Sequence, residues 1–354
     1  MSGYNRLLDA EVTRREALRL GLLGGAVLSA ADIIAACSSG TSSTGSTQSV
    51  NMKVGHDSPL THPYQKAVEA FKKEVESKTN GRVKITIYPN AQLGDEATMV
   101  NGLKIGAVDA VFTSTSPISA SVKEVDVFNL PFLFKDSAQA AAAANGDLGK
   151  ALRPLIETAT QAEVAGWGAG GDRDMWNSKR PVRTPDDVRG LKMRTQASQV
   201  QQDTYAAFGA LPTVISFSEL YTAVQTGVVD GADNGPVDMV ALKFYQVTKY
   251  LTLTRHFTIV VAFLVSKKFM SKISSADQDV IRTAGKNAGA VETQGQNDQS
   301  AAAVTSLKGQ GIQVVELDAQ TRQSFADKVQ SVFAKDQDLV GGSSVVQLAR
   351  QAAS

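Results

Sequence analysis

Two arginines beside predicted strands are the side chains in this sequence best suited to binding a small anion. Arg173 follows Gly171 at the start of one predicted strand, and Arg194 ends the segment GLKMR at residues 190–194. A guanidinium group can donate two parallel hydrogen bonds to a carboxylate, and such charge-assisted pairs are short and strong. Spacing alone leaves two other roles open for both arginines, exposure on the surface or a salt bridge between lobes.

The sequence lacks the residue patterns that common catalytic sites require. It has no GxSxG nucleophile motif and no HExxH zinc motif, and the glycines of residues 168–171 lack the lysine of a phosphate-binding loop. His56 and His62 lie six residues apart, which suits hydrogen bonding or the start of a helix better than a metal site. One cysteine and three histidines are too few to favour a Cys/His metal site, so we expect no metal. Because the catalytic motifs are missing, we also expect no cofactor and no enzymatic activity.

The charge balance of the chain argues against a nucleic-acid partner. Among its 354 residues, 36 lysines and arginines are balanced by 35 aspartates and glutamates. No basic field is therefore available to hold a polyanion.

The length of the chain, 354 residues, exceeds what one compact core usually supports, so we expect two lobes of ordinary domain size.

Residues 1–36 have the features of an export signal. Arg14 and Arg15 precede an apolar run at residues 20–36. This run is shorter than the roughly 20 apolar residues that a membrane span needs, and a positive segment followed by an apolar one is typical of a signal peptide. The paired arginines resemble a twin-arginine export signal.

The apolar run ends in the sequence IAAC at residues 34–37, which resembles a bacterial lipobox. In that interpretation Cys37 is acylated and becomes the mature N-terminus, which anchors the protein to a membrane outside the cytoplasm. The alternative is a small buried cysteine in a helix. Residues 38–49 contain no large apolar side chain, so we expect residues 37–50 to form a flexible tether.

Hydrophobic periodicity beyond the tether predicts an α/β protein. Alternating apolar residues predict strands, and apolar residues three or four apart predict helices. The order strand–helix–strand–helix–strand in the first part favours a parallel sheet with helices on both faces. These first segments are expected at residues 50–56, 62–79, 82–88, 94–105 and 108–112.

The same alternation continues, with breaks, to the end of the chain. Further strands are expected at residues 163–168, 173–177, 212–215, 229–234, 251–257, 259–266 and 312–317. Further helices are expected at residues 198–208, 218–225 and 275–309 and in the residues that follow the last strand. Because ligands of open α/β sheets bind beyond the carboxyl ends of the strands, the site should be formed by the loops there. These loops are residues 56–61, 113–117, 171–176, 194–198, 215–218 and 233–238.

Seven short blocks of sequence carry a family resemblance. They are YPNAQLG (88–94), GAVD (106–109), LPFLF (130–134), GLKMR (190–194), FGALPT (208–213), FSELYTAVQTGVVDG (217–231) and FYQV (244–247). Together they closely resemble the solute receptors of tripartite ATP-independent periplasmic (TRAP) transporters, the DctP family. The resemblance implies a periplasmic-binding-protein-like fold of two α/β lobes with a hinge and a central ligand cleft. We place lobe I at residues 51–171 and 260–299 and lobe II at residues 172–259 and 300–354.

The resemblance also implies roles for individual residues. Arg194 matches the arginine that pairs with the ligand carboxylate, and Arg173 matches a second arginine of the cleft. Asn234 would support the same carboxylate, and Phe217 would be an aromatic residue of the cleft. The family pattern DGxEN is DGADN here, at residues 230–234. The polar residues expected to set ligand identity from the other lobe are Asp57, Glu96, Ser114 and Thr115.

The residues leave the identity of the ligand open. The two arginines favour a carboxylate, and several polar residues favour hydroxyl groups. Trp176 could stack on the apolar face of a sugar or pack in the core. We expect a sugar acid such as a uronate or an aldonate, with a C4-dicarboxylate or a keto acid as alternatives.

The resemblance implies transport rather than catalysis. We expect a monomeric extracytoplasmic receptor that closes its lobes around the ligand and delivers it to the TRAP membrane permease. A receptor that reports to a sensor kinase is an alternative that the sequence leaves open. A secreted enzyme with the same fold would need catalytic groups, and an ABC-type receptor would not share the GLKMR and FSELYTAVQTGVVDG blocks.

Overall fold

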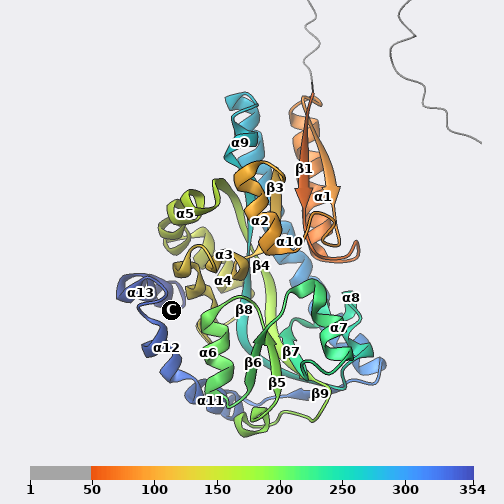
Figure 1. The fold of residues 1–354 in the computed structure, drawn as a ribbon, viewed down its shortest axis with the longest axis vertical. Coiled ribbons are helices and arrows are strands. Elements are labelled where there is room, and N and C mark those ends of the chain that lie inside the picture. Colours follow the sequence, from red (N-terminus) through yellow and green to blue (C-terminus); the bar gives the residue numbers. More distant parts are fainter. Residues whose placement is uncertain (1–48) are drawn as a thin grey trace, which may run out of the picture. The chain divides into compact units, whose positions relative to one another are not determined.

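Nine strands form one sheet in the computed structural model, which describes residues 49–354 (Figure 1). The expected signal peptide, Cys37 and the tether up to residue 48 lie outside the described residues. Val50, expected both as the end of the tether and as the start of the first strand, is the first residue of strand β1. The sheet order is β2-β1-β3-β8-β4-β7-β5-β6, and β9 pairs with β8.

The strands vary from four to 17 residues in length. Their bounds are β1 Val50–Gly55, β2 Val83–Tyr88, β3 Ala110–Ser114, β4 Ala162–Asn177, β5 Lys192–Thr195, β6 Leu211–Val214, β7 Gly231–Asn234, β8 Tyr250–Ser266 and β9 Gln313–Glu316. The sheet is mixed rather than parallel throughout. Strand β1 pairs in parallel with β2 and β3, as the periodicity predicted for the first part of the chain, and β5 pairs in parallel with β6 and β7. Strands β4 and β8 instead run antiparallel to each other and to β7 and β3.

The long strands β4 and β8 correct the sequence interpretation, which expected two strands in place of each. The glycines of residues 168–171 lie at and between the ends of the two strands expected there, but the chain continues as one strand through register shifts that include one between Ala169 and Asp172. Gly171 lies in this irregular stretch with a φ of 86°, a conformation that favours glycine. Because β8 and β4 are neighbours at the centre of the sheet order, they connect β1–β3 with β5–β7 (Figure 1).

Thirteen α-helices are described in residues 49–354. Their bounds are α1 Pro63–Lys78, α2 Glu96–Ile105, α3 Ser116–Ser119, α4 Ser137–Asn145, α5 Asp147–Thr160, α6 Gln199–Ala207, α7 Leu220–Gln225, α8 Pro236–Ala241, α9 Lys267–Met270, α10 Ser275–Gly309, α11 Ala319–Lys328, α12 Gln330–Asp336 and α13 Gly342–Ala352. Helix α10 has the bounds that the sequence predicted. Helices α4 and α5 were not predicted. None of the helices in this part of the chain combines the length and apolar character needed to span a bilayer.

Helix α10 lies against both β4 and α1. Its contact with β4 depends on glycines on the two elements, because a Cβ on Gly168 would lie 2.5 Å from the Gly289 carbonyl oxygen. The apolar side of α1 packs on the sheet, where Phe71 contacts Phe263 with ring centroids 4.4 Å apart. These contacts fix the start of α1 and the middle of α10 beside the carboxyl end of β1.

Candidate functional site

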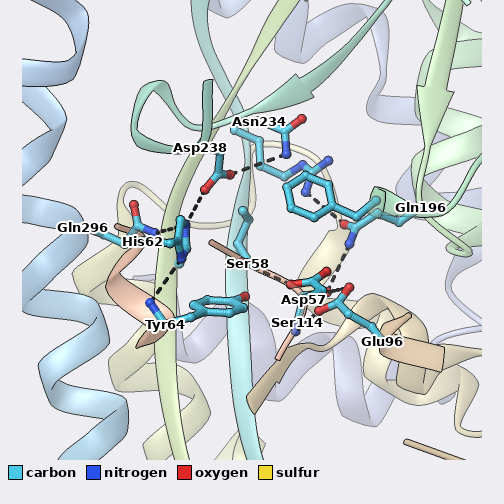
Figure 2. Close-up of a pocket in the computed structure, with 14 residues that line it drawn as sticks. Asp57, Ser58, His62, Tyr64, Glu96, Ser114, Gln196, Asn234, Asp238 and Gln296 are labelled. Carbon is cyan, nitrogen blue, oxygen red and sulfur yellow. Dashed lines mark hydrogen bonds and ion pairs between the residues drawn. The ribbon is translucent and has the colours of Figure 1, made fainter. Parts of the chain in front are cut away.

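A pocket lies at the ends of strands from both halves of the sheet (Figure 2). Asp57 and Ser58 follow β1, Ser114 ends β3, and Asn234 ends β7. The other lining residues come from the elements around them: His62, Tyr64, Glu96, Gly170, Arg173, Gln196, Phe217, Asp238, Ile259 and Gln296. The pocket therefore lies where the sequence analysis expected it, beyond the carboxyl ends of the strands.

Six of the predicted ligand-binding residues line this pocket: Asp57, Glu96, Ser114, Arg173, Phe217 and Asn234. Arg194 lines an adjoining pocket, which shares Glu96, Gln196 and Phe217 with the first. Thr115 and Trp176 line neither of them. The structure thus brings seven of the nine predicted residues together.

Trp176 belongs to the hydrophobic core, which corrects its suggested role in ligand stacking. Its side chain is fully buried, and its ring stacks on Phe244 with centroids 5.0 Å apart. Successive residues of a strand face opposite sides of the sheet, so the position three residues beyond Arg173 faces the other way. Thr115 is also buried, at the start of α3 just beyond the last residue of β3.

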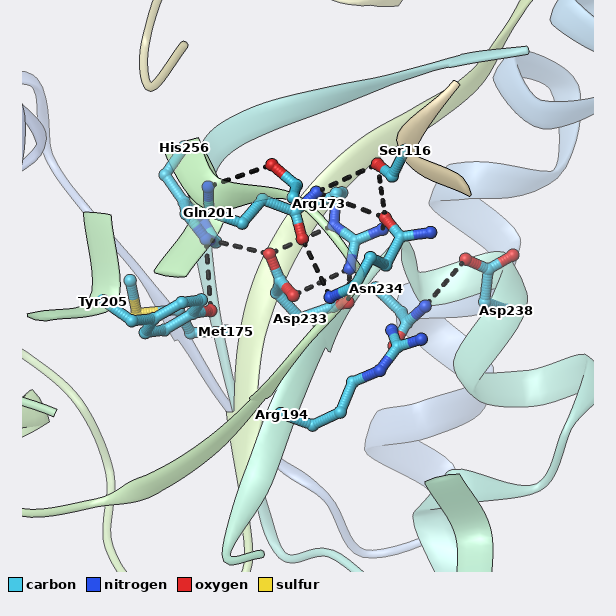
Figure 3. Close-up of polar contacts among 12 residues, drawn as sticks. Ser116, Arg173, Met175, Arg194, Gln201, Tyr205, Asp233, Asn234, Asp238 and His256 are labelled. Atoms are coloured by element: carbon cyan, nitrogen blue, oxygen red, sulfur yellow. Dashed lines mark hydrogen bonds and ion pairs between the residues drawn. The ribbon is translucent and has the colours of Figure 1, made fainter. Parts of the chain in front are cut away.

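Arg173 is neutralised within the protein (Figure 3). Its Nε and Nη2 donate to the two carboxylate oxygens of Asp233 at 3.0 and 2.8 Å, and Nη1 donates to Gln196 Oε1 at 2.9 Å. Burial opposes the charge of Asp233, but Arg173 and His256 hold its pKa well below its usual range. His256 Nε2 lies 3.2 Å from Asp233 Oδ2, which completes a buried network.

Arg194, in contrast, has no carboxylate partner among the described residues, although only 1% of it is exposed. Its Nε donates to the Ile215 carbonyl oxygen at 2.8 Å, and its Nη1 has no hydrogen-bond partner in the described part of the chain. Burial and the nearby charge of Arg173 lower the pKa of Arg194 to about 10. A buried cation with a free donor favours binding of an anion.

Two side chains flank these arginines. The Phe217 ring centroid lies 5.7 Å from the Arg194 guanidinium carbon, within the range of a cation–π contact. Asn234 donates from Nδ2 to Asp238 Oδ2 at 3.4 Å, and its Oδ1 has no partner among the described residues. Both residues belong to the wall of the pocket next to Arg173.

The opposite wall is acidic, with Asp57, Glu96 and Ser114 grouped together in Figure 2. Glu96 lies in the first turn of α2 and accepts from the Ser114 backbone N–H at 2.7 Å and from its hydroxyl at 3.1 Å. Burial and the charge of Glu96 raise the pKa of Asp57 well above its usual range. A protonated Asp57 can donate a hydrogen bond, and Glu96 can accept one, so this wall suits hydroxyl groups.

Sequence reasoning missed several pocket residues, among them Gln196, Asp238 and Gln296. Gln196 donates to Ser114 Oγ at 3.1 Å while it accepts from Arg173, so it connects the two walls. It lies within a loop that was expected to form the site, but its residue type carries no signal by itself. Gln296 lies in the middle of α10, where helical periodicity indicates only a face of the helix. Residues 49–354 contain no group of three His, Cys, Asp or Glu side chains placed to hold a metal ion.

The chain is similar in sequence to a family of known proteins. The model of the bacterial extracellular solute-binding protein family 7 (DctP) matches residues 54–338. A solute-binding protein of Verminephrobacter eiseniae is 36% identical over 250 residues, which are 71% of this chain and 74% of the relative.

Solved structures show the same fold. A TRAP periplasmic solute-binding protein from Polaromonas sp. JS666, bound to D-erythronate, superimposes with a TM-score of 0.80 at 34% identity, over 84% of this chain and 98% of the other. The sugar-acid-binding protein DctPAm of Advenella mimigardefordensis, in complex with galactonate, gives a TM-score of 0.83 at 29% identity, over 86% and 98%.

Proposed function

We propose that this chain, which belongs to the bacterial extracellular solute-binding protein family 7, captures a sugar acid by pairing its carboxylate with Arg194. As a member of this family, the chain is a TRAP-type solute-binding receptor that acts outside the cytoplasm. The proposal concerns the class of ligand and the residues that hold it.

The Arg194 guanidinium carries this proposal, because among the described residues it has no carboxylate partner and its Nη1 has no hydrogen-bond partner. Arg173 has its counter-ion in Asp233, so the second positive charge of the site is left for the ligand. A carboxylate at Arg194 Nη1 would satisfy the buried donor and offset the repulsion between the two arginines. Asn234 could support the same carboxylate through its second amide hydrogen.

The acidic wall favours a ligand with hydroxyl groups over a dicarboxylate. Asp57 and Glu96 would accept from or donate to hydroxyls, whereas a second ligand carboxylate would meet two acidic side chains. The relatives bound to D-erythronate and galactonate support a uronate or aldonate as the ligand. A C4-dicarboxylate or a keto acid is the alternative class.

Delivery of the ligand would follow closure of two lobes around the pocket. We place lobe I at residues 51–171 and 260–299 and lobe II at residues 172–259 and 300–354. The irregular stretch of β4 around Gly171, paired with β8 near Thr258 and Val260, supports a hinge at these boundaries. A closed receptor would present a surface that a TRAP permease distinguishes from the open one.

Attachment to the membrane belongs to the same proposal. Acylation of Cys37 after twin-arginine export would anchor a monomeric receptor near its permease. The receptor would bind and release its ligand without breaking bonds, which agrees with the relatives named above being receptors.

A thermal-shift screen of the purified chain tests the ligand class. The panel is D-erythronate, galactonate, D-glucuronate, succinate, pyruvate and neutral galactose. We expect stabilisation by the sugar acids, about 2.7 kcal/mol for a ligand at 100 times its Kd. A shift with galactose equal to that with galactonate would exclude the carboxylate pairing, and a shift with succinate alone would favour the dicarboxylate alternative. A chain that responds to none of these acids would contradict the proposed function.

A further inference from the structure

A buried hydrogen bond joins two residues that lie 176 positions apart in the sequence and meet at one side of the pocket (Figure 2). His62 Nε2 lies 2.8 Å from Asp238 Oδ1, and the side chains are 3% and 7% exposed. His62 precedes α1, which follows β1, and Asp238 lies on α8, which follows β7. With the lobe boundaries proposed above, His62 belongs to lobe I and Asp238 to lobe II.

The other nitrogen of His62 fixes which ring atom donates. Nδ1 accepts a hydrogen bond from the Tyr64 backbone N–H at 3.1 Å and thereby caps the start of α1. An acceptor nitrogen carries no proton, so in this geometry the ring proton is on Nε2 and is donated to Asp238. The cap therefore orients the imidazole for its bond to Asp238.

Asp238 also forms a hydrogen bond with Asn234. Its Oδ2 accepts from Asn234 Nδ2 at 3.4 Å, which turns the amide nitrogen of Asn234 toward Asp238. In the opposite amide orientation, two oxygens would face each other. The order His62, Asp238, Asn234 thus ends at the residue that lies beside the carboxylate position proposed above.

The surroundings leave few alternative donors for Asp238. Two other acids, Glu292 of α10 and Asp57 of the loop between β1 and α1, lie near enough to His62 to act on it electrostatically. Arg173 on β4 adds an attractive charge but uses its hydrogen bonds on Asp233 and Gln196. The hydrogen-bond donors that reach Asp238 among the described residues are His62 and Asn234.

We propose that His62 is a positioning residue whose bond to Asp238 forms when the lobes close, holds them closed and orients Asn234 toward the ligand. We call the pair His62–Asp238 the clasp. The proposal rests on the proposed function, because the ligand is what closes the lobes. The clasp acts on release: a lobe cannot open without breaking a buried hydrogen bond to a carboxylate.

The variant His62→Asn separates the clasp from the helix cap. The shorter side chain retains an oxygen that can accept the Tyr64 N–H, and asparagine is a favourable N-cap residue, but it lacks the Nε2–H that reaches Asp238. We expect the sugar acid that binds best in the thermal-shift panel to dissociate about tenfold faster from this variant than from the wild type. The free energy of unfolding without ligand should be nearly unchanged.

A double-mutant cycle and a control make the test specific. Asp238→Ala should also speed dissociation, and adding His62→Asn to it should have little further effect. The control is His56→Asn, which alters a buried histidine that bonds to Gln65 within lobe I and does not line the pocket. We expect it to leave the dissociation rate unchanged.

Lobe closure can be followed separately with spin labels. Labels at Lys66→Cys on α1 and Gln225→Cys on α7 use two exposed positions, in a full chain with Cys37→Ser. With ligand bound, we expect His62→Asn to broaden the distance distribution toward the open form. Equal dissociation rates and equal distributions for His62→Asn and the wild type would overturn the clasp while ligand binding stands. A wild type that binds no acid would overturn both proposals.

Discussion

At the scale of single residues, the two pocket arginines have opposite energetic roles. Arg173 is paired with Asp233, and breaking a buried pair leaves a charge uncompensated. Arg194 has no such partner among the described residues, so a bound anion would offset part of the cost of its burial. Binding and stability should therefore respond in different ways when each arginine is replaced.

Replacing Arg194 should weaken binding without weakening the fold. We expect Arg194→Met to lower affinity for the best sugar acid by at least about 2 kcal/mol, roughly 30-fold, because the carboxylate loses its buried partner. Unfolding without ligand should need as much urea or more. The contrasting variant Arg173→Met should cost about 3 kcal/mol of stability, since Asp233 loses its counter-ion. Titration calorimetry and urea unfolding measure both effects, and wild-type affinity in Arg194→Met would rule out the carboxylate pairing.

Glu292 gives a pH dependence with a defined sign. This fully buried carboxyl accepts from Gln296, and burial raises its pKa to about 7. The folded state then binds a proton that the unfolded state releases above its ordinary pKa near 4.5, so this group lowers stability as pH rises from 4.5 to 7. We expect Glu292→Gln to stabilise the protein at pH 8 by up to about 3 kcal/mol and to change it little at pH 4.5.

Urea unfolding at the two pH values measures this difference. The control is Glu219→Gln, which replaces an exposed carboxyl and should have the same small effect at both pH values. A Glu292→Gln effect that is equal at pH 4.5 and pH 8 would show that burial does not shift this carboxyl.

At the scale of elements, the contact of α10 with β4 positions the pocket residues that these two elements carry. The helix approaches so closely that Gly289 lies against the backbone of Trp167, where a Cβ would overlap. We expect Gly289→Ala to cost about 2 kcal/mol or more, because backbone must move to admit the methyl group. The same change at Gly309, in the last turn of α10 with open space around it, should be neutral or stabilise by about 0.5 kcal/mol.

Thermal unfolding of the two glycine variants checks the expectation. If both variants melt like the wild type, the helix does not rest on β4 as closely as described. Because Gln296 lies on the same helix and lines the pocket, Gly289→Ala should also weaken ligand binding.

The elements that sequence patterns predicted are those with a clear period. Alternating Val83, Ile85 and Ile87 indicated β2, and β2 is present. Helix α4 is a run of alanines, which have high helix propensity but no apolar face to detect. The break expected inside β4 was wrong because glycine, which often ends a strand, here forms an irregular stretch within one.

The pocket could be predicted in part for similar reasons. The loops of the pocket could be predicted from the ends of the expected strands. Its arginines could be predicted because a guanidinium group binds a carboxylate well. The partner of each arginine could not be predicted, because Asp233 and Arg173 are 60 residues apart and meet only through the pairing of β4 with β7. The bond between His62 and Asp238 depends likewise on the folded chain.

At the scale of the whole molecule, each half of the sheet contains strands from distant parts of the sequence. Strand β3 pairs with β8, and the residues in register, such as Phe112 and Phe263, are about 150 positions apart. Strand β4 lies between β8 and β7. Strand β8 lies between β3 and β4 and so joins the two halves of the sheet.

This arrangement has a consequence for the order in which the chain is made. A ribosome adds residues 250–266 only after about 70% of the chain, and until then β3 and β4 each expose an unpaired edge. A fragment that ends at residue 249 should aggregate rather than fold, and sedimentation of the expressed fragment would show it; a soluble, folded fragment would contradict this. Folding before export would have to wait for β8 to emerge from the ribosome.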